Sequence, residues 1–475
     1  MYIVIGGGIS GIAAAIKLKE ALGADARVVL IEKSPRLGGK IKSVTLAGKE
    51  VEVGPDSFLT RSDAAIDLIG KLGVSEQLVR PKKFGASIYA RGRLHSVPDG
   101  MMLGVPISIG PFVRSASMLS PIGRLRAAAD LFLPKTVLGN DATISHLVAA
   151  RFGHEVDDVL VDPMVGGINA GSTRILGLAS VAPQFLSAYT SSNHRSLART
   201  MIAVSPAKTP STPAPIPFAS LGGGLQALIE AAESFMNRAG IEILCDCEVQ
   251  DIARLGDGFE ISTLQRKAGQ AERMTSLEVK GVVVALPAGD AAKVLRGICP
   301  SASAKLANIE YADVAMTVMR YSKSAFRKVL TGSGVLVPRK VGRLTTAVTF
   351  ASQKWAHLEL ADSELLRVSV GRFGDDRFAA FSDKQLQNLI EGELSEILST
   401  TKDASEAVTW RWEAALPQYR PFHKDLVASI RGELASCGPI QLCGAAMDGV
   451  GIPACIDSGT RAAEQLFEPG SATQA

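Results

Sequence analysis

Short hydrophobic runs and one amphipathic stretch alternate at the start of the chain. Tyr2–Ile5 is apolar, Gly6–Gly11 is rich in glycine, and Ile12–Leu22 repeats its apolar positions with the period of a helix. A second apolar run, Arg27–Glu32, follows. Because short apolar runs on either side of a helix are typical of strands, the chain begins with a predicted β-α-β unit.

From about residue 60 to residue 200 the pattern becomes mainly helical. The predicted helices there are Arg61–Leu72, Leu119–Leu133 and Ile144–Phe152. The stretch Pro206–Pro217 holds too much proline for a helix and predicts a surface loop.

Beyond this loop, strands and helices alternate again. Gly222–Gly224 opens a predicted helix that runs through Phe235, and Val279–Ala285 is a continuous β-branched run, typical of a strand buried on both faces. The other predicted elements are strands at Ile241–Val249, Ala312–Tyr321, Leu365–Gly371 and Ile440–Gly444, and a last helix from about Asp457 to Leu466.

This order of elements predicts an α/β fold with three parts. Residues 1–82, 215–290 and 426–475 form a discontinuous, Rossmann-type nucleotide-binding domain. Residues 83–97 and 291–425 form a mixed-sheet domain, which we expect to bind substrate, and residues 98–205 form a helical insertion.

Composition and charge narrow the classes of function. The chain has 475 residues, 47% of them hydrophobic, which is enough for a large core. Its net charge of +4 comes with no dense run of Lys or Arg, which argues against nucleic acid as a partner. The six cysteines form no C-x-x-C pair and no cluster with histidine, so neither a disulfide framework nor a metal site is expected.

Two features bear on location. Met1 leads straight into the first apolar run with no basic, cleavable segment before it, so we expect a reducing, cytoplasmic compartment. The apolar segment Val97–Val113 carries Asp99 and three prolines, which rules out a membrane-spanning helix. Peripheral contact with a membrane and the lining of an apolar tunnel are the two interpretations that remain open for it.

A glycine pattern lies where the first predicted strand passes into the first helix. In Gly6-x-Gly8-x-x-Gly11, the first glycine allows a tight turn, the second lets backbone approach a pyrophosphate, and the third lets helix and strand pack closely. The free N–H groups at the start of the helix attract the same anion. Glu32 ends the second strand, where a carboxylate can hold a ribose, so the unit predicts a dinucleotide site.

Two further glycine-rich segments favour a long cofactor. Arg36–Lys40 (RLGGK) follows Glu32, and its adjacent glycines allow a second close passage of backbone, with a plain surface turn as the alternative. Gly444–Pro453 places three glycines and a proline ahead of the last predicted helix. Backbone N–H groups before a helix can donate to an electron-rich group such as a reduced flavin ring.

Taken together, GGGISG, Glu32, RLGGK and the C-terminal glycines resemble the FAD-dependent amine oxidase superfamily. The resemblance implies FAD as the cofactor and makes the nucleotide domain an FAD-binding domain. It implies that Glu32 holds the adenosine ribose and that Val249 presents its backbone to adenine. The other cofactor contacts that it implies are Gly6, Gly8, Ile9, Ser10 and Gly11, then Lys33, Arg36, Gly38, Gly39 and Lys40, then Gly54, Pro55, Asp56 and Ser57, and finally Gly444, Gly451, Ile452 and Pro453.

Longer segments narrow the resemblance to bacterial porphyrinogen oxidases of the HemY type. These segments are EVGPDSFLTR (Glu52–Arg61), VDPMVGGINAG (Val161–Gly171), ASLGGGL (Ala219–Leu225), RWEAALPQY (Arg411–Tyr419) and DGVGIPACIDSG (Asp448–Gly459). The similarity covers essentially the whole chain. It implies an oxidoreductase of haem biosynthesis that converts coproporphyrinogen III to coproporphyrin III by six-electron oxidation. FAD would accept hydride from the substrate, and dioxygen would reoxidise the flavin, with hydrogen peroxide as product.

On the substrate side, the resemblance places Gly167, Ile168 and Asn169 at the porphyrinogen, with a turn that ends a helix as the alternative. Val450–Pro453 contains no aromatic residue of the kind that flanks the flavin in amine oxidases, and an apolar pocket suits a large macrocycle. Candidate propionate partners, each of which is alternatively a solvated surface charge, are Arg61, Lys82, Lys83, Arg91 and Arg93. Related sequences often carry a basic residue after GPDSFL-x-R, where this chain has Ser62 and Asp63.

Several alternatives stay open on sequence alone. The same scaffold serves protoporphyrinogen IX oxidation, carotenoid desaturation and amine oxidation, and a similar architecture without redox chemistry occurs in dissociation inhibitors of prenylated GTPases. The partners that the resemblance implies are the porphyrinogen and dioxygen, together with transient contact with other haem-pathway enzymes. Tyr419 is expected near the flavin or in the core, and the scattered histidines are expected to be structural.

Overall fold

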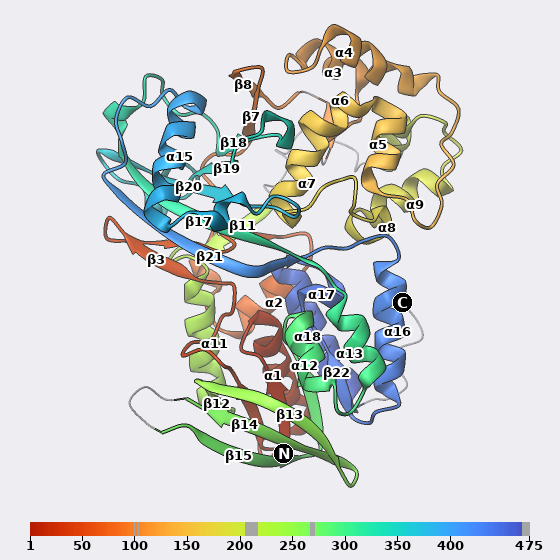
Figure 1. Ribbon diagram of the computed structural model, residues 1–475, viewed down its shortest axis with the longest axis vertical. Helices are drawn as coiled ribbons and strands as arrows, with labels where there is room; N and C mark the ends of the chain where they lie inside the picture. The colour runs from red at the N-terminus through yellow and green to blue at the C-terminus, as the bar shows by residue number, and fades with distance from the viewer. Residues whose placement is uncertain (99, 103, 205–216, 267–270, 468–475) are drawn as a thin grey trace.

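The first strand lies in the middle of a parallel sheet in the computed structural model, which describes residues 1–98, 100–102, 104–204, 217–266 and 271–467 (Figure 1). The strand order is β12-β2-β1-β16-β22, and all neighbouring strands are parallel. Every residue of β2 and β16 is buried, as expected for strands covered on both faces. The strands are β1 (Tyr2–Ile5), β2 (Val28–Ile31), β12 (Glu242–Leu244), β16 (Gly281–Val284) and β22 (Ile440–Leu442).

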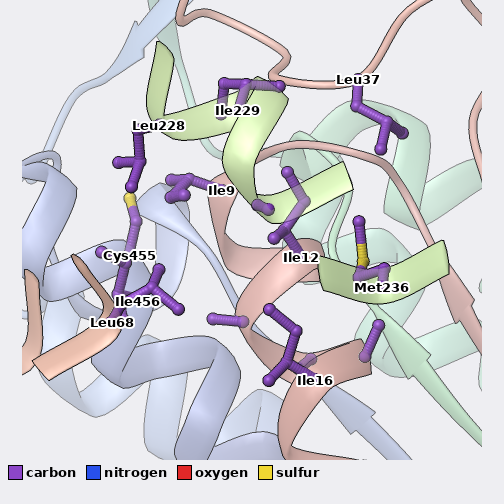
Figure 2. Packing of buried hydrophobic residues seen from close by; sticks show 14 of the residues in the cluster. Ile9, Ile12, Ile16, Leu37, Leu68, Leu228, Ile229, Met236, Cys455 and Ile456 are labelled. Carbon is purple, nitrogen blue, oxygen red and sulfur yellow. The ribbon is translucent and has the colours of Figure 1, made fainter. Parts of the chain in front are cut away.

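Two layers cover this sheet. On one face α1 (Ile9–Leu22), α11 (Gln226–Arg238) and α18 (Ile452–Phe467) share an apolar cluster, in which Figure 2 shows Ile12, Ile229 and Ile456. The other face packs against three helices and an antiparallel sheet. These elements are α12 (Ala288–Leu295), α13 (Pro300–Ala307), α16 (His423–Ala435), β13 (Cys247–Leu255), β14 (Gly258–Gln265) and β15 (Arg273–Val279).

A second, mixed sheet of seven strands lies above the nucleotide-binding part in Figure 1. Its order is β21-β17-β20-β19-β18-β7-β8, and the β18–β7 pair is parallel within an otherwise antiparallel sheet. Helix α15 (Asp383–Ile397) covers one face. The strands are β7 (Ala86–Ala90), β8 (Arg93–Ser96), β17 (Tyr311–Ser322), β18 (Gly334–Leu336), β19 (Thr345–Phe350), β20 (Ser363–Val370) and β21 (Glu406–Pro417).

Helices from the part of the chain between β8 and β11 (Phe218–Leu221) form a separate apolar cluster at one end of the molecule (Figure 1). A fully buried ion pair, Arg151 Nε to Asp130 Oδ1 at 2.7 Å, lies inside it. The helices are α3 (Ile109–Ser115), α4 (Pro121–Ala128), α5 (Ile144–Phe152), α6 (His154–Val156), α7 (Asp162–Asn169), α8 (Leu178–Val181), α9 (Pro183–Ser191) and α10 (Leu197–Val204).

The predicted fold class is confirmed: a discontinuous Rossmann-type domain, a mixed sheet and a helical insertion make up an α/β protein. Some element boundaries were wrong. Ile241–Val249 is two strands of different sheets because the chain turns at Asp246, which has a φ of 53°. The run Val279–Ala285 divides at Lys280, between β15 and β16.

Two predicted helices begin elsewhere. The last helix starts at Ile452 rather than near Asp457, because Pro453 fits the first turn of a helix, where no N–H partner is needed. The helix predicted from Arg61 starts at Ala64, as α2 (Ala64–Lys71). The predicted loop Pro206–Pro217 lies, except for its last residue, outside the described residues.

Candidate functional site

The glycine turn between β1 and α1 combines tight packing with open space. A Cβ added at Gly11 would lie 1.9 Å from the carbonyl oxygen of Gly6, and one at Gly6 would lie 2.6 Å from that of Ala285. At Gly8, an added Cβ would meet no described atom within 4 Å, and no side chain of the described residues caps α1. Packing therefore fixes Gly6 and Gly11, whereas the helix end at Gly8, Ile9 and Ser10 is left for an anionic ligand.

Glu32 lies beside this turn. Its Oε2 accepts a hydrogen bond from Gly7 N at 2.6 Å, and its Oε1 accepts one from Ser34 N at 2.8 Å. Each carboxylate oxygen can accept two hydrogen bonds, so both oxygens keep capacity for the two hydroxyls of a ribose. The open helix end and this carboxylate together fit the pyrophosphate and ribose of a dinucleotide such as FAD.

The RLGGK segment passes directly against the glycine turn. Gly38 N donates to the carbonyl oxygen of Gly7 at 2.8 Å, and a Cβ added at Gly39 would lie 3.1 Å from the Cα of Gly8. Both glycines have positive φ, 103° and 55°, which favours glycine at each position. The RLGGK backbone therefore packs closely against the glycine turn, and its passage past a long cofactor stays a prediction.

Arg36 supports this segment from within. Its guanidinium donates to the carbonyl oxygens of Leu37, Gly39 and Ile41 at 2.9, 2.7 and 2.9 Å. These three bonds hold the RLGGK turn in shape.

The C-terminal glycines reach the same place through α18. A Cβ added at Gly459 would lie 2.0 Å from the carbonyl oxygen of Ser10, and one at Gly444 would lie 3.7 Å from Ser10 Oγ. Gly444 N donates to Ser458 Oγ at 2.9 Å, and Gly449 has a φ of 136°. The segments that flank the predicted cofactor thus meet at the start of α1, although they come from opposite ends of the chain.

Side chains that sequence analysis missed hold the C-terminal segment. The carboxylate of Asp448 accepts from Arg431 at 2.7 Å and also from Ser458, and Arg461 forms an ion pair with it at 3.1 Å. Burial alone would raise the pKa of Asp448, but the two arginines hold that pKa below its usual value. No spacing in the sequence links these residues.

Tyr419 and His423 hold the next turn. The Tyr419 hydroxyl donates to the carbonyl oxygen of Ala445, and His423 Nε2 lies 2.8 Å from that of Ala446. The two rings pack with centroids 4.5 Å apart. Tyr419 therefore supports α17 (Ala445–Asp448), which lies within the glycine-rich segment Gly444–Pro453.

The segment Gly54–Ser57 is clamped to the mixed sheet. Asp56 accepts from Lys354 Nζ at 2.8 Å and from Trp355 Nε1 at 3.2 Å, and Arg367 forms an ion pair with it at 3.0 Å. Arg367 also donates to the carbonyl oxygen of Gly54. The Asp56 carboxylate and the Gly54 carbonyl oxygen thus bind protein cations, and a cofactor contact of Gly54–Ser57 stays a prediction.

On the adenosine side, β13 lies next to Glu32. Cys247 N donates to the Glu32 carbonyl oxygen at 3.0 Å, and the register of β13 shifts just after Val249. Lys33 points outward, with its side chain 57% exposed, and pairs with Asp290 at 3.2 Å.

Of the residues predicted at the substrate, Gly167 and Ile168 lie at the end of α7, where Ile168 is 64% exposed. A Cβ added at Gly167 would come within 3.6 Å of Leu336. Asn169 is only 4% exposed, and its side chain donates to the carbonyl oxygen of Val165, which supports the helix end. Gln418 Nε2 donates to the Asn169 carbonyl oxygen at 3.0 Å.

The basic candidates for propionate pairing do not converge. Lys82 pairs with Glu359, Lys83 contacts Gln353, and Arg91 lies 3.7 Å from Glu155. Arg61 and Arg93 are exposed. Among the residues described, no helix is both long and apolar enough to cross a membrane, and no group of His, Cys, Asp and Glu has the arrangement of a metal site.

Comparison with known proteins identifies the family of the chain. The profile of the flavin-containing amine oxidoreductase family matches residues 9–467. Coproporphyrinogen III oxidase of Bacillus subtilis (strain 168) is 31% identical over 467 residues, which span 97% of this chain and 96% of that protein. The protein of the same name from Mycobacterium leprae (strain TN) is 32% identical over 469 residues, 98% of each chain. The crystal structure of a putative protoporphyrinogen oxidase from Exiguobacterium sp. 255-15 is 28% identical, with a TM-score of 0.83 over 98% of each chain.

Proposed function

This chain belongs to the flavin-containing amine oxidoreductase family, and from that premise we propose that it oxidises coproporphyrinogen III to coproporphyrin III with dioxygen as the acceptor. It is a flavin-dependent oxidoreductase, and its cofactor is FAD. The observation that carries the proposal is the full-length similarity, at 31% identity, to the Bacillus subtilis enzyme named for this activity. We further place the protein in the cytoplasm, because its six cysteines are free thiols, as is usual in a reducing compartment.

We assign the three ranges given above to the FAD-binding, substrate-binding and helical domains. FAD would be held by the backbone of Gly8–Gly11, Gly38–Gly39 and Gly451–Pro453, with Glu32 at the ribose and Val249 near adenine. This is supported by the open helix end at Gly8 and by the free hydrogen-bonding capacity of Glu32. When bound, FAD supplies the two-electron acceptor for each of the three steps that the six-electron oxidation needs.

The chain's own residues bind and orient the macrocycle. We propose that Gly167 and Ile168 border the porphyrinogen, since a glycine next to an exposed isoleucine gives a flat, apolar edge. We place Asn169 behind this edge as a support, because Gln418 donates to its carbonyl oxygen and its side chain donates to the carbonyl oxygen of Val165 in its own helix. Protons leave the substrate to water or dioxygen-derived product, and no acid–base residue is assigned to them.

Protoporphyrinogen IX is the second candidate substrate, favoured by the similarity to the Exiguobacterium protein. Purified holoprotein should be supplied with each porphyrinogen in turn, while porphyrin fluorescence, oxygen uptake and hydrogen peroxide are recorded. We expect a higher kcat/KM for coproporphyrinogen III. A higher value for protoporphyrinogen IX, or turnover of amines alone, would overturn the proposal. Transient contact with other haem-pathway enzymes stays a prediction.

We also propose a weak, peripheral contact with anionic membranes, at a different place from the one predicted. Val105 and Phe112 of the predicted segment are 1% and 0% exposed, so they belong to the protein core. Further along, Ile122, Leu125, Phe132 and Val137 are 80%, 74%, 85% and 88% exposed. Exposed apolar side chains with basic neighbours, here Arg114 and Lys135, suit a negatively charged surface.

Vesicle sedimentation tests this contact. The wild-type protein should sediment with vesicles that contain phosphatidylglycerol and less with vesicles of phosphatidylcholine alone, and I122S/L125S should lose the difference. Equal sedimentation of the wild type and I122S/L125S would refute this location, and no sedimentation of the wild type would refute the contact itself.

A further inference from the structure

Two of the six cysteines, Cys299 and Cys437, meet in the folded chain although they are far apart in the sequence. Cys299 directly precedes α13, and Cys437 follows the last turn of α16. Their thiols contact each other through a hydrogen bond. Both side chains pack in the apolar cluster on the face of the parallel sheet that α13 and α16 cover. The two cysteines thus form a pair that no short spacing in the sequence announces.

A second set of contacts between the two helices supports this arrangement. Helices α13 and α16 lie side by side (Figure 1). On α13, the ammonium group of Lys305 donates to the hydroxyl of Ser429 at 2.7 Å and to the carboxylate of Glu433, both on α16. Lys305 lies about one to two turns after Cys299, and its partners lie about one to two turns before Cys437. The helices are therefore antiparallel, which brings the start of α13 to the end of α16, where the thiols meet.

The two thiols differ in how easily a reagent from solvent can reach them. Cys299 is 5% exposed, and burial together with the neighbouring Cys437 thiol raises its pKa. Cys437 is only partly buried, and its Sγ donates to the carbonyl oxygen of Glu433 at 3.4 Å. The guanidinium group of Arg254 donates to the carbonyl oxygen of Cys437 at 3.0 Å, so a cation lies beside this residue. An oxidant therefore meets Cys437 first, with a second thiol directly beside it.

We propose that Cys299 and Cys437 form a modification site that hydrogen peroxide oxidises reversibly to a disulfide. The Cys437 thiolate attacks one oxygen of the peroxide, the O–O bond breaks, and water leaves, which gives a sulfenic acid. The Cys299 sulfur then attacks the Cys437 sulfur, the S–O bond breaks, and a second water leaves as the S–S bond forms. The two thiols together lose two electrons and two protons, and the peroxide gains both.

Hydrogen peroxide is also the product of the proposed reaction with dioxygen. The source of the oxidant thus rests on the proposed function, whereas the site itself does not. The disulfide joins α13 to the helix that holds the C-terminal glycine segment, because Arg431 of α16 donates to Asp448 and His423 of α16 contacts the carbonyl oxygen of Ala446. In a reducing compartment such a bond is transient, as is usual for dithiols that respond to oxidants.

The test exposes the FAD-loaded protein to added hydrogen peroxide without porphyrinogen, so a wrong substrate assignment does not affect it. All thiols are first reduced, and after a brief exposure the peroxide is removed and free thiols are counted in denaturant. The wild type should fall from six free thiols to four. Peptide mapping by mass spectrometry should find one linked pair that contains Cys299 and Cys437, and a dithiol reductant should restore all six thiols.

Variants that lack one thiol supply the controls. Cys299→Ser and Cys437→Ser should each form no disulfide under the same exposure. Cys245→Ser is the matched control, because Cys245 is the other partly buried cysteine, and this variant should lose the same two thiols as the wild type. An unchanged thiol count in the wild type, a disulfide that involves a different cysteine, or a disulfide that still forms in Cys437→Ser would each overturn the proposal.

Discussion

Asp56→Asn should destabilise the protein strongly, because it removes the carboxylate that forms ion pairs with two nearly buried cations, Lys354 and Arg367. The Asp56, Arg367 and Lys354 side chains are 11%, 5% and 16% exposed. Removing one partner of such an ion pair leaves a buried charge uncompensated, which costs about 3–5 kcal/mol. Denaturation of the apoprotein, followed by tryptophan fluorescence, is a direct assay, since Trp355 touches Asp56 and the other two tryptophans, Trp410 and Trp412, lie on β21.

Glu359→Gln is the control, because Glu359 and its partner Lys82 are 56% and 45% exposed, and solvent screens an exposed pair so that its loss should hardly change stability. The pH dependence has a definite sign. Burial alone would raise the pKa of Asp56, but Lys354 and Arg367 hold it well below its usual value. The stabilisation that the Asp56 carboxylate provides is therefore fully present above the unfolded pKa of about 3.9 and is lost as the pH falls below that value. A loss below about 1 kcal/mol at pH 7, or a difference from wild type that grows toward low pH, would refute this reasoning.

Three further predictions concern the cofactor site. Gly11→Ala should lower both the stability of the apoprotein and its affinity for FAD, since the new Cβ would lie 1.9 Å from the carbonyl oxygen of Gly6. Gly8→Ala has open space at its Cβ, so the stability of the apoprotein should stay within about 1 kcal/mol of wild type. A fluorescence titration should show a loss of FAD affinity in both variants. Glu32→Gln should weaken FAD binding by about 10–100-fold, because a charge-assisted hydrogen bond contributes about 1.5–3 kcal/mol; an unchanged Kd would exclude Glu32 from the ribose. Tyr419→Phe should lower the free energy of unfolding by about 1–3 kcal/mol, because the carbonyl oxygen of Ala445 loses its hydrogen-bond donor. An unchanged free energy of unfolding in calorimetry would mean that water replaces the hydroxyl.

The backbone parts of the fold and site could be predicted from sequence because local sterics decide them. The strand Tyr2–Ile5 and the helix Ile144–Phe152 have the predicted boundaries, since periodicity and capping act over a few residues. The turn at Asp246 was missed because an aspartate at positive φ leaves no pattern in the surrounding residues. Glycine at 6 and 11 could be interpreted for the opposite reason: only a missing side chain permits the close approaches found at these two positions.

The side chains that support the site could not be predicted in this way. Asp56 and Lys354 come from the nucleotide-binding part and the mixed sheet, and Asp448 and Arg431 come from two different helices, α17 and α16. Their partners are set by tertiary packing, to which neither helical nor strand periodicity is sensitive. A resemblance to a family can suggest which residues touch the cofactor, but it does not distinguish a contact from a support, as Asp56 and Asn169 illustrate.

Arg36→Lys tests this distinction in the RLGGK segment. The planar guanidinium of Arg36 donates to three carbonyl oxygens at 2.7–2.9 Å, a task for which a lysine ammonium lacks the spread of donors. A lysine there would keep the charge but leave at least one of these carbonyl oxygens without its partner, which costs about 1–3 kcal/mol of stability in the turn. Because the Gly38–Gly39 turn loosens, FAD affinity should fall by about tenfold. If the charge of Arg36 acted directly on the phosphates instead, Arg36→Lys would bind FAD almost as wild type does, and fluorescence titration separates the two roles.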